Sequence, residues 1–173
     1  VDDGLGKAVA FGQVGILAPN RLVERTPQAM EIDGIAFEFQ NLPGSEAPAE
    51  LTFYLPQWKA FCGAEMLSHT MHNLYTLRGA KVRDALRWSA YIDAALAQAG
   101  AAELYFGSHH WPVWGHERIQ DFMLKQRDVY RYTHDQTVRL MNAGLGPDEI
   151  AEQLQLPAAL DGFLNVHGYY GTL

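Results

Sequence analysis

Apolar and polar residues alternate in short runs near the start of the chain. One run covers Ala29 to Ile32 and the next covers Ile35 to Phe39, with Asp33-Gly34 between them. Strict alternation is typical of a strand with one buried face. An Asp-Gly dipeptide suits the positive φ angles of a two-residue turn. The pattern therefore predicts a β-hairpin over residues 29–39.

A second pair of runs follows after a stretch rich in turn residues. Residues 51–55 and 59–62 flank Pro56-Gln57-Trp58, which predicts a strand, a turn and another strand. The intervening stretch from Asn41 to Pro48 contains two prolines and a glycine, so we expect a loop there. Loops at strand ends are common places for functional residues.

The pattern then changes from a period of two to helical spacing. Residues 82–99 are predicted to form a helix that ends near Gly100, because their apolar positions fall close to helical spacing: Val82, Leu86, Trp88, Ile92, Ala95 and Leu96. Leu104-Tyr105-Phe106 predicts a short strand. The loop Gly107 to Pro112 follows it.

Beyond Pro112 the pattern is helical throughout. Residues 116–142 predict a long helix ended by Gly144, and a shorter helix is expected to start at Pro147, where a fixed φ suits the first helical position. Residues 157–168 are expected to be helical as well. The chain is thus predicted to be α/β, with an α/β part over residues 1–114 followed by an all-helical part over 115–173.

Composition and charge narrow the class of protein. The 173 residues are 48% hydrophobic and 19% charged, as in a globular chain with one sizeable core. No run reaches the roughly 20 apolar residues that a membrane span needs. The formal net charge of −7 argues against a nucleic-acid-binding surface. Cys62 lies in an apolar run, and we expect an inert buried thiol there.

Four residues in predicted loops or turns could bind a metal ion. Glu46 and Glu65 offer carboxylates, and His109-His110 offers imidazoles, which are donors that suit zinc. Their scattered spacing matches neither H-E-x-x-H nor C-x-x-C. Each also has a purely structural interpretation, as a surface loop cap, an N-terminal helix carboxylate or an exposed histidine. Spacing alone leaves both interpretations open.

A second candidate site is the donor-rich run from His69 to Asp84. It contains His69, His72, Asn73, Tyr75, Arg78 and Arg83, and it has no acidic residue before Asp84. Planar guanidinium groups can bind two oxygens of an anion at once, so the run would suit an oxyanion. A solvated basic surface is an equally good interpretation of the same residues.

Taken in order along nearly the whole chain, several segments together resemble the alkyl sulfatases of the metallo-β-lactamase superfamily, which hydrolyse detergent-like sulfate esters. The segments are Pro43 to Glu50, Gly63-Ala64-Glu65, His72 to Ala80, Ser108 to Pro112, Gln126-Arg127-Asp128, His134 to Thr137, and Gly168 to Gly171. The resemblance implies the C-terminal part of a metallo-β-lactamase αββα sandwich, followed by the start of an all-helical dimerisation domain.

The resemblance also implies roles for individual residues. Glu46, Glu65 and His110 are the expected ligands of two zinc ions, and Glu65 is expected to bridge the ions. His109 is the alternative to His110. Three residues are expected to bind the substrate: Asn73 and Arg78 at the sulfate group, and Tyr91 lining the site. An alkyl sulfate is then the expected substrate. The resemblance also implies a homodimer. It favours a periplasmic or secreted location over the cytoplasm.

The sequence departs from the family pattern at one point. The H-x-H-x-D-H motif that supplies the other zinc ligands in such enzymes does not occur in these 173 residues. We therefore expect the chain to be an internal segment of the enzyme that is inactive by itself. Two alternatives are a different hydrolase of the superfamily, such as a lactonase or phosphodiesterase, and a non-catalytic dimerisation module.

Overall fold

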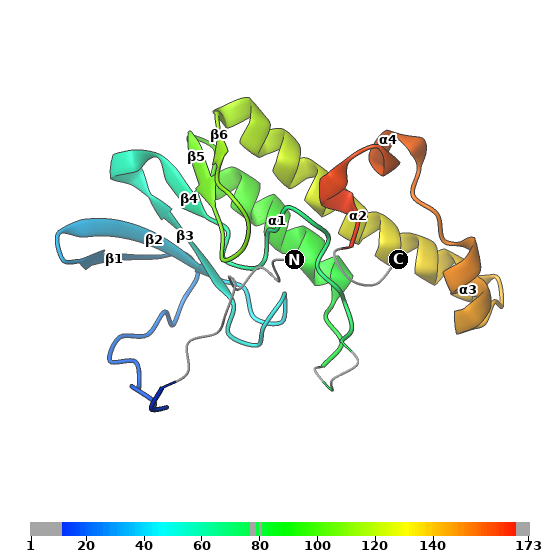
Figure 1. The fold of residues 1–173 in the computed structure, drawn as a ribbon, viewed down its shortest axis with the longest axis horizontal. Helices are drawn as coiled ribbons and strands as arrows, with labels where there is room; N and C mark the ends of the chain where they lie inside the picture. Colours follow the sequence, from blue (N-terminus) through cyan, green and yellow to red (C-terminus); the bar gives the residue numbers. More distant parts are fainter. Residues whose placement is uncertain (1–11, 77–78, 80, 169–173) are drawn as a thin grey trace.

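A computed structural model describes residues 12–76, 79 and 81–168. Six strands form one sheet in chain order (Figure 1): β1 (Gln28–Ile32), β2 (Ile35–Asn41), β3 (Leu51–Leu55), β4 (Ala60–Cys62), β5 (Leu104–Phe106) and β6 (Val113–Trp114). Neighbouring strands are antiparallel except β4 and β5, which run parallel with Phe61 opposite Tyr105. This parallel pair requires a crossover connection, which the chain between them supplies.

Both predicted strand pairs are present. Ile32 pairs with Ile35 across the tight turn, where Asp33 and Gly34 have φ angles of 51° and 77°. A short 3-10 helix, η1 (Pro56–Trp58), connects β3 to β4 and ends at Lys59, whose φ is 46°. Strand β6 was not predicted, because two residues are too few to show an alternation.

The helix α1 (Ala85–Gln98) begins three residues later than its apolar pattern indicates. Asp84 is its N-cap and accepts a hydrogen bond from the backbone N–H of Arg87 at 3.0 Å. An N-cap residue has a non-helical backbone, so the chain before Asp84 cannot continue the helix. The displaced start leaves Arg83 outside the helix, next to the loops described below.

The helical second part is confirmed in outline. The long helix α2 (His116–Asn142) matches its predicted bounds, and Gly144 follows with a φ of 91°. The helix α3 (Pro147–Gln153) begins at the predicted proline. The prediction of a single helix over residues 157–168 is wrong in part. The chain there forms two short helices, α4 (Ala158–Asp161) and η2 (Leu164–Val166), separated at Phe163, whose backbone is extended. None of the described helices could span a membrane.

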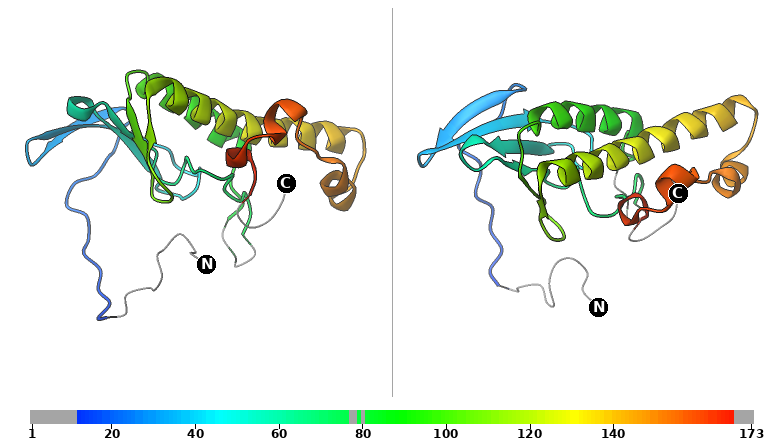
Figure 2. Two further views of the ribbon diagram at one scale, coloured as in Figure 1. Left: turned by 45° about the horizontal axis from the view of Figure 1, so that its top comes forward. Right: turned by 90° about the horizontal axis from the view of Figure 1, so that it is seen from above.

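The helices α1 and α2 lie side by side on one face of the sheet (Figure 2). One continuous core joins all three elements and includes Trp88 and Ile92 of α1, Tyr105 of β5, and Ile119 and Met123 of α2. All five side chains are fully buried. Residues on both sides of position 114 share this core, and the domain boundary at that position stays a prediction.

The opposite face of the sheet also carries apolar side chains. The strand register places Phe39, Phe53, Cys62 and Phe106 in one row across four strands. The ring centroids of Phe39 and Phe53 lie 5.7 Å apart, and those of Phe53 and Phe106 lie 6.0 Å apart. A sheet with apolar rows on both faces is typical of a layered sandwich, which agrees with the expected fold class.

Candidate metal centre

The candidate site lies where three strands end at the same edge of the sheet. Strands β2 and β4 are both antiparallel to β3, and β4 is parallel to β5. The carboxyl ends of β2, β4 and β5 therefore point the same way, and the loops that follow them meet. Ligand sites in α/β proteins commonly form outside such strand ends.

The loop after β2 carries Glu46. It is closed by a hydrogen bond from the backbone N–H of Leu42 to the carbonyl of Glu50 at 2.7 Å. Inside it, the buried side chain of Ser45 donates to the carbonyl of Leu42 at 3.0 Å. Gly44 has a φ of 79°, in the region that favours glycine. These contacts direct the loop back over the sheet edge and hold Glu46 there.

The turn after β4 carries Glu65 and packs tightly against β5. A side chain on Gly63 would meet the ring of Tyr105 at 2.6 Å, so only glycine fits. The N–H of Gly63 donates to the carbonyl of Phe106 at 2.9 Å. The N–H of Glu65 donates to the carboxylate of the buried Glu50 at 2.9 Å. The turn therefore holds Glu65 in a defined position at the strand end.

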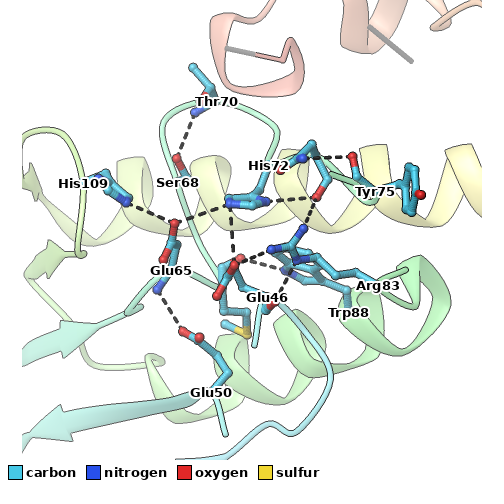
Figure 3. A network of polar contacts seen from close by, with 12 residues as sticks. Glu46, Glu50, Glu65, Ser68, Thr70, His72, Tyr75, Arg83, Trp88 and His109 are labelled. Atoms are coloured by element: carbon cyan, nitrogen blue, oxygen red, sulfur yellow. Dashed lines mark hydrogen bonds and ion pairs between the residues drawn. The ribbon is translucent and has the colours of Figure 1, made fainter. Parts of the chain in front are cut away.

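Two of the predicted metal ligands converge, and a third residue joins them (Figure 3). Ligand atoms of Glu46, Glu65 and His72 all lie within 4.8 Å of one another. The His72 Nε2 atom is 3.4 Å from Glu65 Oε1 and 3.9 Å from Glu46 Oε1. His72 was not predicted as a ligand. Its signal in the sequence was its place in the donor-rich run shortly after Glu65.

The adjacent histidines differ in their surroundings. His109 is half-buried, and its Nε2 lies 3.0 Å from Glu65 Oε1. His110 is exposed, with a backbone φ of 66°. Its ring contacts His69 and Trp111 edge-on, at centroid distances of 5.6 Å and 5.7 Å. The structure thus brings His109 to Glu65, while the ring of His110 packs beside His69.

One of the two predicted sulfate-binding residues, Asn73, lies next to this cluster. Asn73 follows His72 directly, and its Nδ2 donates to the carbonyl of Tyr75 at 2.9 Å. Its Oδ1 is buried and has no hydrogen-bond partner in the described part of the chain. Arg78 lies outside the described residues. Tyr91, on α1, donates to the carbonyl of Pro43 at 3.1 Å and so contacts the loop that carries Glu46.

The electrostatics of the cluster reflect its mixed composition. The pKa of Glu65 is lowered, chiefly by the hydrogen bond with His72 and further by His109, against an opposing effect of burial. Burial raises the pKa of Glu50, which lies behind Glu65. An ionised Glu65 beside imidazole nitrogens is a donor set that suits zinc, and a carboxylate can bridge two ions. The residues present therefore fit a zinc site.

No family model matches the chain, but it is similar to characterised proteins along its whole length. It is 46% identical to the alkyl/aryl-sulfatase BDS1 of Saccharomyces cerevisiae over 174 aligned positions that cover 100% of the chain. It is 44% identical to a linear primary-alkylsulfatase and 42% identical to an (R)-specific secondary-alkylsulfatase, both of Pseudomonas sp., over 98% and 100% of the chain. The chain belongs to the alkylsulfatase family. It spans about a quarter of the length of these relatives, or 25–27%.

Solved structures confirm the alkylsulfatase fold. The stereoselective inverting sec-alkylsulfatase Pisa1 from Pseudomonas sp. is 41% identical, with a TM-score of 0.87 over 90% of this chain and 25% of that one. A metallo-β-lactamase family protein from Thermus thermophilus is 19% identical, with a TM-score of 0.51 over 66% of this chain and 36% of that one. The predicted family and fold class, part of a metallo-β-lactamase fold, are thus both confirmed.

Proposed function

We propose that the full-length alkylsulfatase that carries this chain hydrolyses alkyl sulfate esters such as dodecyl sulfate to alcohol and sulfate, using two zinc ions. The relatives named for alkyl sulfate hydrolysis support the reaction class. The observation that carries the proposal for this chain is the convergence of Glu46, Glu65 and His72 at the strand ends. Carboxylates and imidazoles gathered in this way suit zinc.

In this proposal Glu46 and Glu65 hold the metal, with Glu65 shared between the ions and one imidazole of His109-His110 completing the contribution of the chain. The 3.0 Å distance from His109 to Glu65 supports His109 in that role. His110 remains the choice that the family resemblance favours. When bound, two zinc ions lower the pKa of a shared water so that hydroxide forms near neutral pH.

The substrate would be held by the segment from His72 onwards. The Nδ2 of Asn73 carries two hydrogens and gives one to Tyr75, so the other can be donated to a sulfate oxygen. We assign Arg78 to the same anion, because a guanidinium can bind two of its oxygens. Tyr91 is proposed to line the site through its position against the Pro43 loop.

Assembly and location are proposed on the family resemblance alone. We propose a homodimer that uses the helices after residue 115, in a periplasmic or secreted location. The two alternative functions make different predictions. A lactonase or phosphodiesterase would use the same carboxylates and imidazoles on another ester. A non-catalytic dimerisation module would not be affected by replacing Glu65.

A panel of substrates tests the proposal. The full-length gene product is assayed with dodecyl sulfate, with a γ- or δ-lactone and with bis(4-nitrophenyl) phosphate, alongside its Glu65→Gln variant. We expect sulfate release from dodecyl sulfate that the variant loses, and little turnover of the other esters. Preferred turnover of the lactone or the phosphodiester would identify a different hydrolase. Equal rates in the variant and the wild type would favour a non-catalytic role for the Glu65 turn.

A further inference from the structure

Arg83 connects two separate loops of the candidate metal centre. It lies directly before Asp84, the N-cap of α1, and its side chain is only 8% exposed. Figure 3 shows its guanidinium between the Glu46 loop and the segment that begins at His72. An arginine that is this enclosed has a defined set of partners, and these partners indicate its role.

The guanidinium donates hydrogen bonds to both loops. Its Nε donates to the backbone carbonyl of Glu46 at 2.7 Å, and Nη2 donates to Oε1 of the same residue at 2.5 Å. Its Nη1 donates to the backbone carbonyl of Asn73 at 3.2 Å. In addition, the backbone N–H of Arg83 donates to the carbonyl of Leu74 at 2.8 Å. Arg83 thus joins Asn73 and Leu74 to the loop that carries Glu46.

We propose that Arg83 is a positioning residue that aligns the Glu46 carboxylate with the sulfate-binding segment. The inference rests on the proposed function, because it takes Glu46 as a metal ligand and Asn73 as a residue that holds sulfate. It adds a physical link between the two halves of the site. One side chain determines where the carboxylate lies relative to the bound anion.

The way in which Arg83 holds Glu46 carries the inference. The ion pairs of the Glu46 carboxylate with Arg83 and with His72 both involve its Oε1 atom. The guanidinium also binds the backbone carbonyl of Glu46, so the carboxylate cannot turn independently of its own loop. Carboxylate ligands are generally oriented by hydrogen bonds of this kind.

Simple charge neutralisation is the competing explanation for Arg83. If only the charge mattered, a lysine at position 83 would serve equally well. A guanidinium presents several donors in one rigid plane, whereas an ammonium is a compact point charge on a flexible stem. A lysine could not reach Glu46 Oε1, the Glu46 carbonyl and the Asn73 carbonyl with one nitrogen in the same geometry. The two explanations therefore differ in what Arg83→Lys should do.

The test uses the full-length gene product with Arg83→Met, Arg83→Lys and a control, Arg127→Met. Arg127 also joins separate elements, because its Nη1, on α2, donates to Oδ1 of Asp93 on α1 at 3.0 Å. It is not part of the metal centre. For each protein, the dissociation constant of zinc is measured by chelator competition and that of inorganic sulfate by inhibition. Thermal denaturation reports on folding.

We expect both Arg83 variants to bind zinc more weakly by roughly 10- to 100-fold. Their affinity for inorganic sulfate should fall in parallel, and Arg127→Met should match the wild type in both constants. Wild-type zinc and sulfate affinity in Arg83→Lys would overturn the proposal, and so would wild-type affinities in Arg83→Met. If Arg83→Met does not fold, Arg83→Lys decides the question. A wild-type protein that binds zinc but does not hydrolyse dodecyl sulfate would contradict the proposed function alone.

Discussion

The hydroxyl oxygen of Tyr130, midway along α2, accepts a hydrogen bond from the backbone N–H of His72 at 2.9 Å. Tyr130 is fully buried and stacks on Trp88 of α1, with ring centroids 4.5 Å apart. The ring of Trp88 in turn lies 5.8 Å from the ring of His72. The long helix of the C-terminal part therefore supports the segment that places His72 beside Glu46 and Glu65.

We expect Tyr130→Phe to destabilise the fold, because it leaves the N–H of His72 without its acceptor. The free energy of unfolding should fall by about 1–3 kcal/mol, the usual effect of leaving a buried donor without a hydrogen-bond acceptor. Chemical denaturation measures it. Tyr132→Phe on the same helix is the control, since that hydroxyl is exposed where it donates to Gln155, and its effect should stay within about 0.5 kcal/mol. Equal losses in both variants would contradict a special role for Tyr130.

A second prediction concerns the close packing beneath Glu65. Gly63→Ala should destabilise the protein by about 1–3 kcal/mol, because the new methyl group would collide with the buried ring of Tyr105. Gly162→Ala is the matched control: nothing lies within 4 Å of its added carbon, and its φ of −75° is acceptable to alanine. Denaturation of both variants checks the difference. Similar stabilities would mean that the turn after β4 can relax.

The sequence was most informative where a local signal was strong. The Asp33-Gly34 turn, the strands beside it and the bounds of α2 follow from alternation, turn chemistry and helical spacing, and the structure confirms them. The start of α1 was predicted too early because Val82 fits the apolar period. In the structure Asp84 caps the helix, so the helix begins only at Ala85. A pattern of apolar residues cannot show where such a cap outweighs it.

The candidate site was only partly accessible from the sequence. Glu46 and Glu65 are 19 positions apart, and they meet because β2 and β4 both run antiparallel to β3, so that the loops after them leave the same edge of the sheet. His72 joins them because Tyr130, 58 residues away, holds its backbone. No local pattern contains such long-range contacts. The donor-rich run by itself indicated an oxyanion site, but the choice of Asn73 and Arg78 within it came from the family resemblance, and their roles stay predictions.

The adjacent histidines give a third prediction. If His109 is the ligand, His109→Ala should lower the zinc content of the full-length gene product, because it removes the imidazole 3.0 Å from Glu65. His110→Ala should retain its zinc, since the ring of His110 packs against His69 and Trp111. Elemental analysis after gel filtration compares the two variants. Zinc loss in His110→Ala alone would instead support the ligand that the family resemblance favours.

A fourth prediction concerns Asn73. We expect Asn73→Ala to raise the KM for dodecyl sulfate and to weaken inhibition by inorganic sulfate, because the amide would no longer donate to the anion. Zinc content should not change, because the proposal places the Asn73 amide on the anion and not on the metal. Steady-state kinetics and metal analysis on one preparation separate these effects. An unchanged KM combined with lost zinc would assign Asn73 to the metal centre.

The central claim is that the cluster around Glu65 holds the metal on which sulfate ester hydrolysis depends. The most direct measurement follows zinc per chain and sulfate release from dodecyl sulfate in one preparation of the full-length gene product. Both are recorded before chelation, after chelation and after zinc is returned. The account predicts two zinc ions per chain, with activity lost and regained together with them. Undiminished sulfate release from the metal-free protein would contradict it.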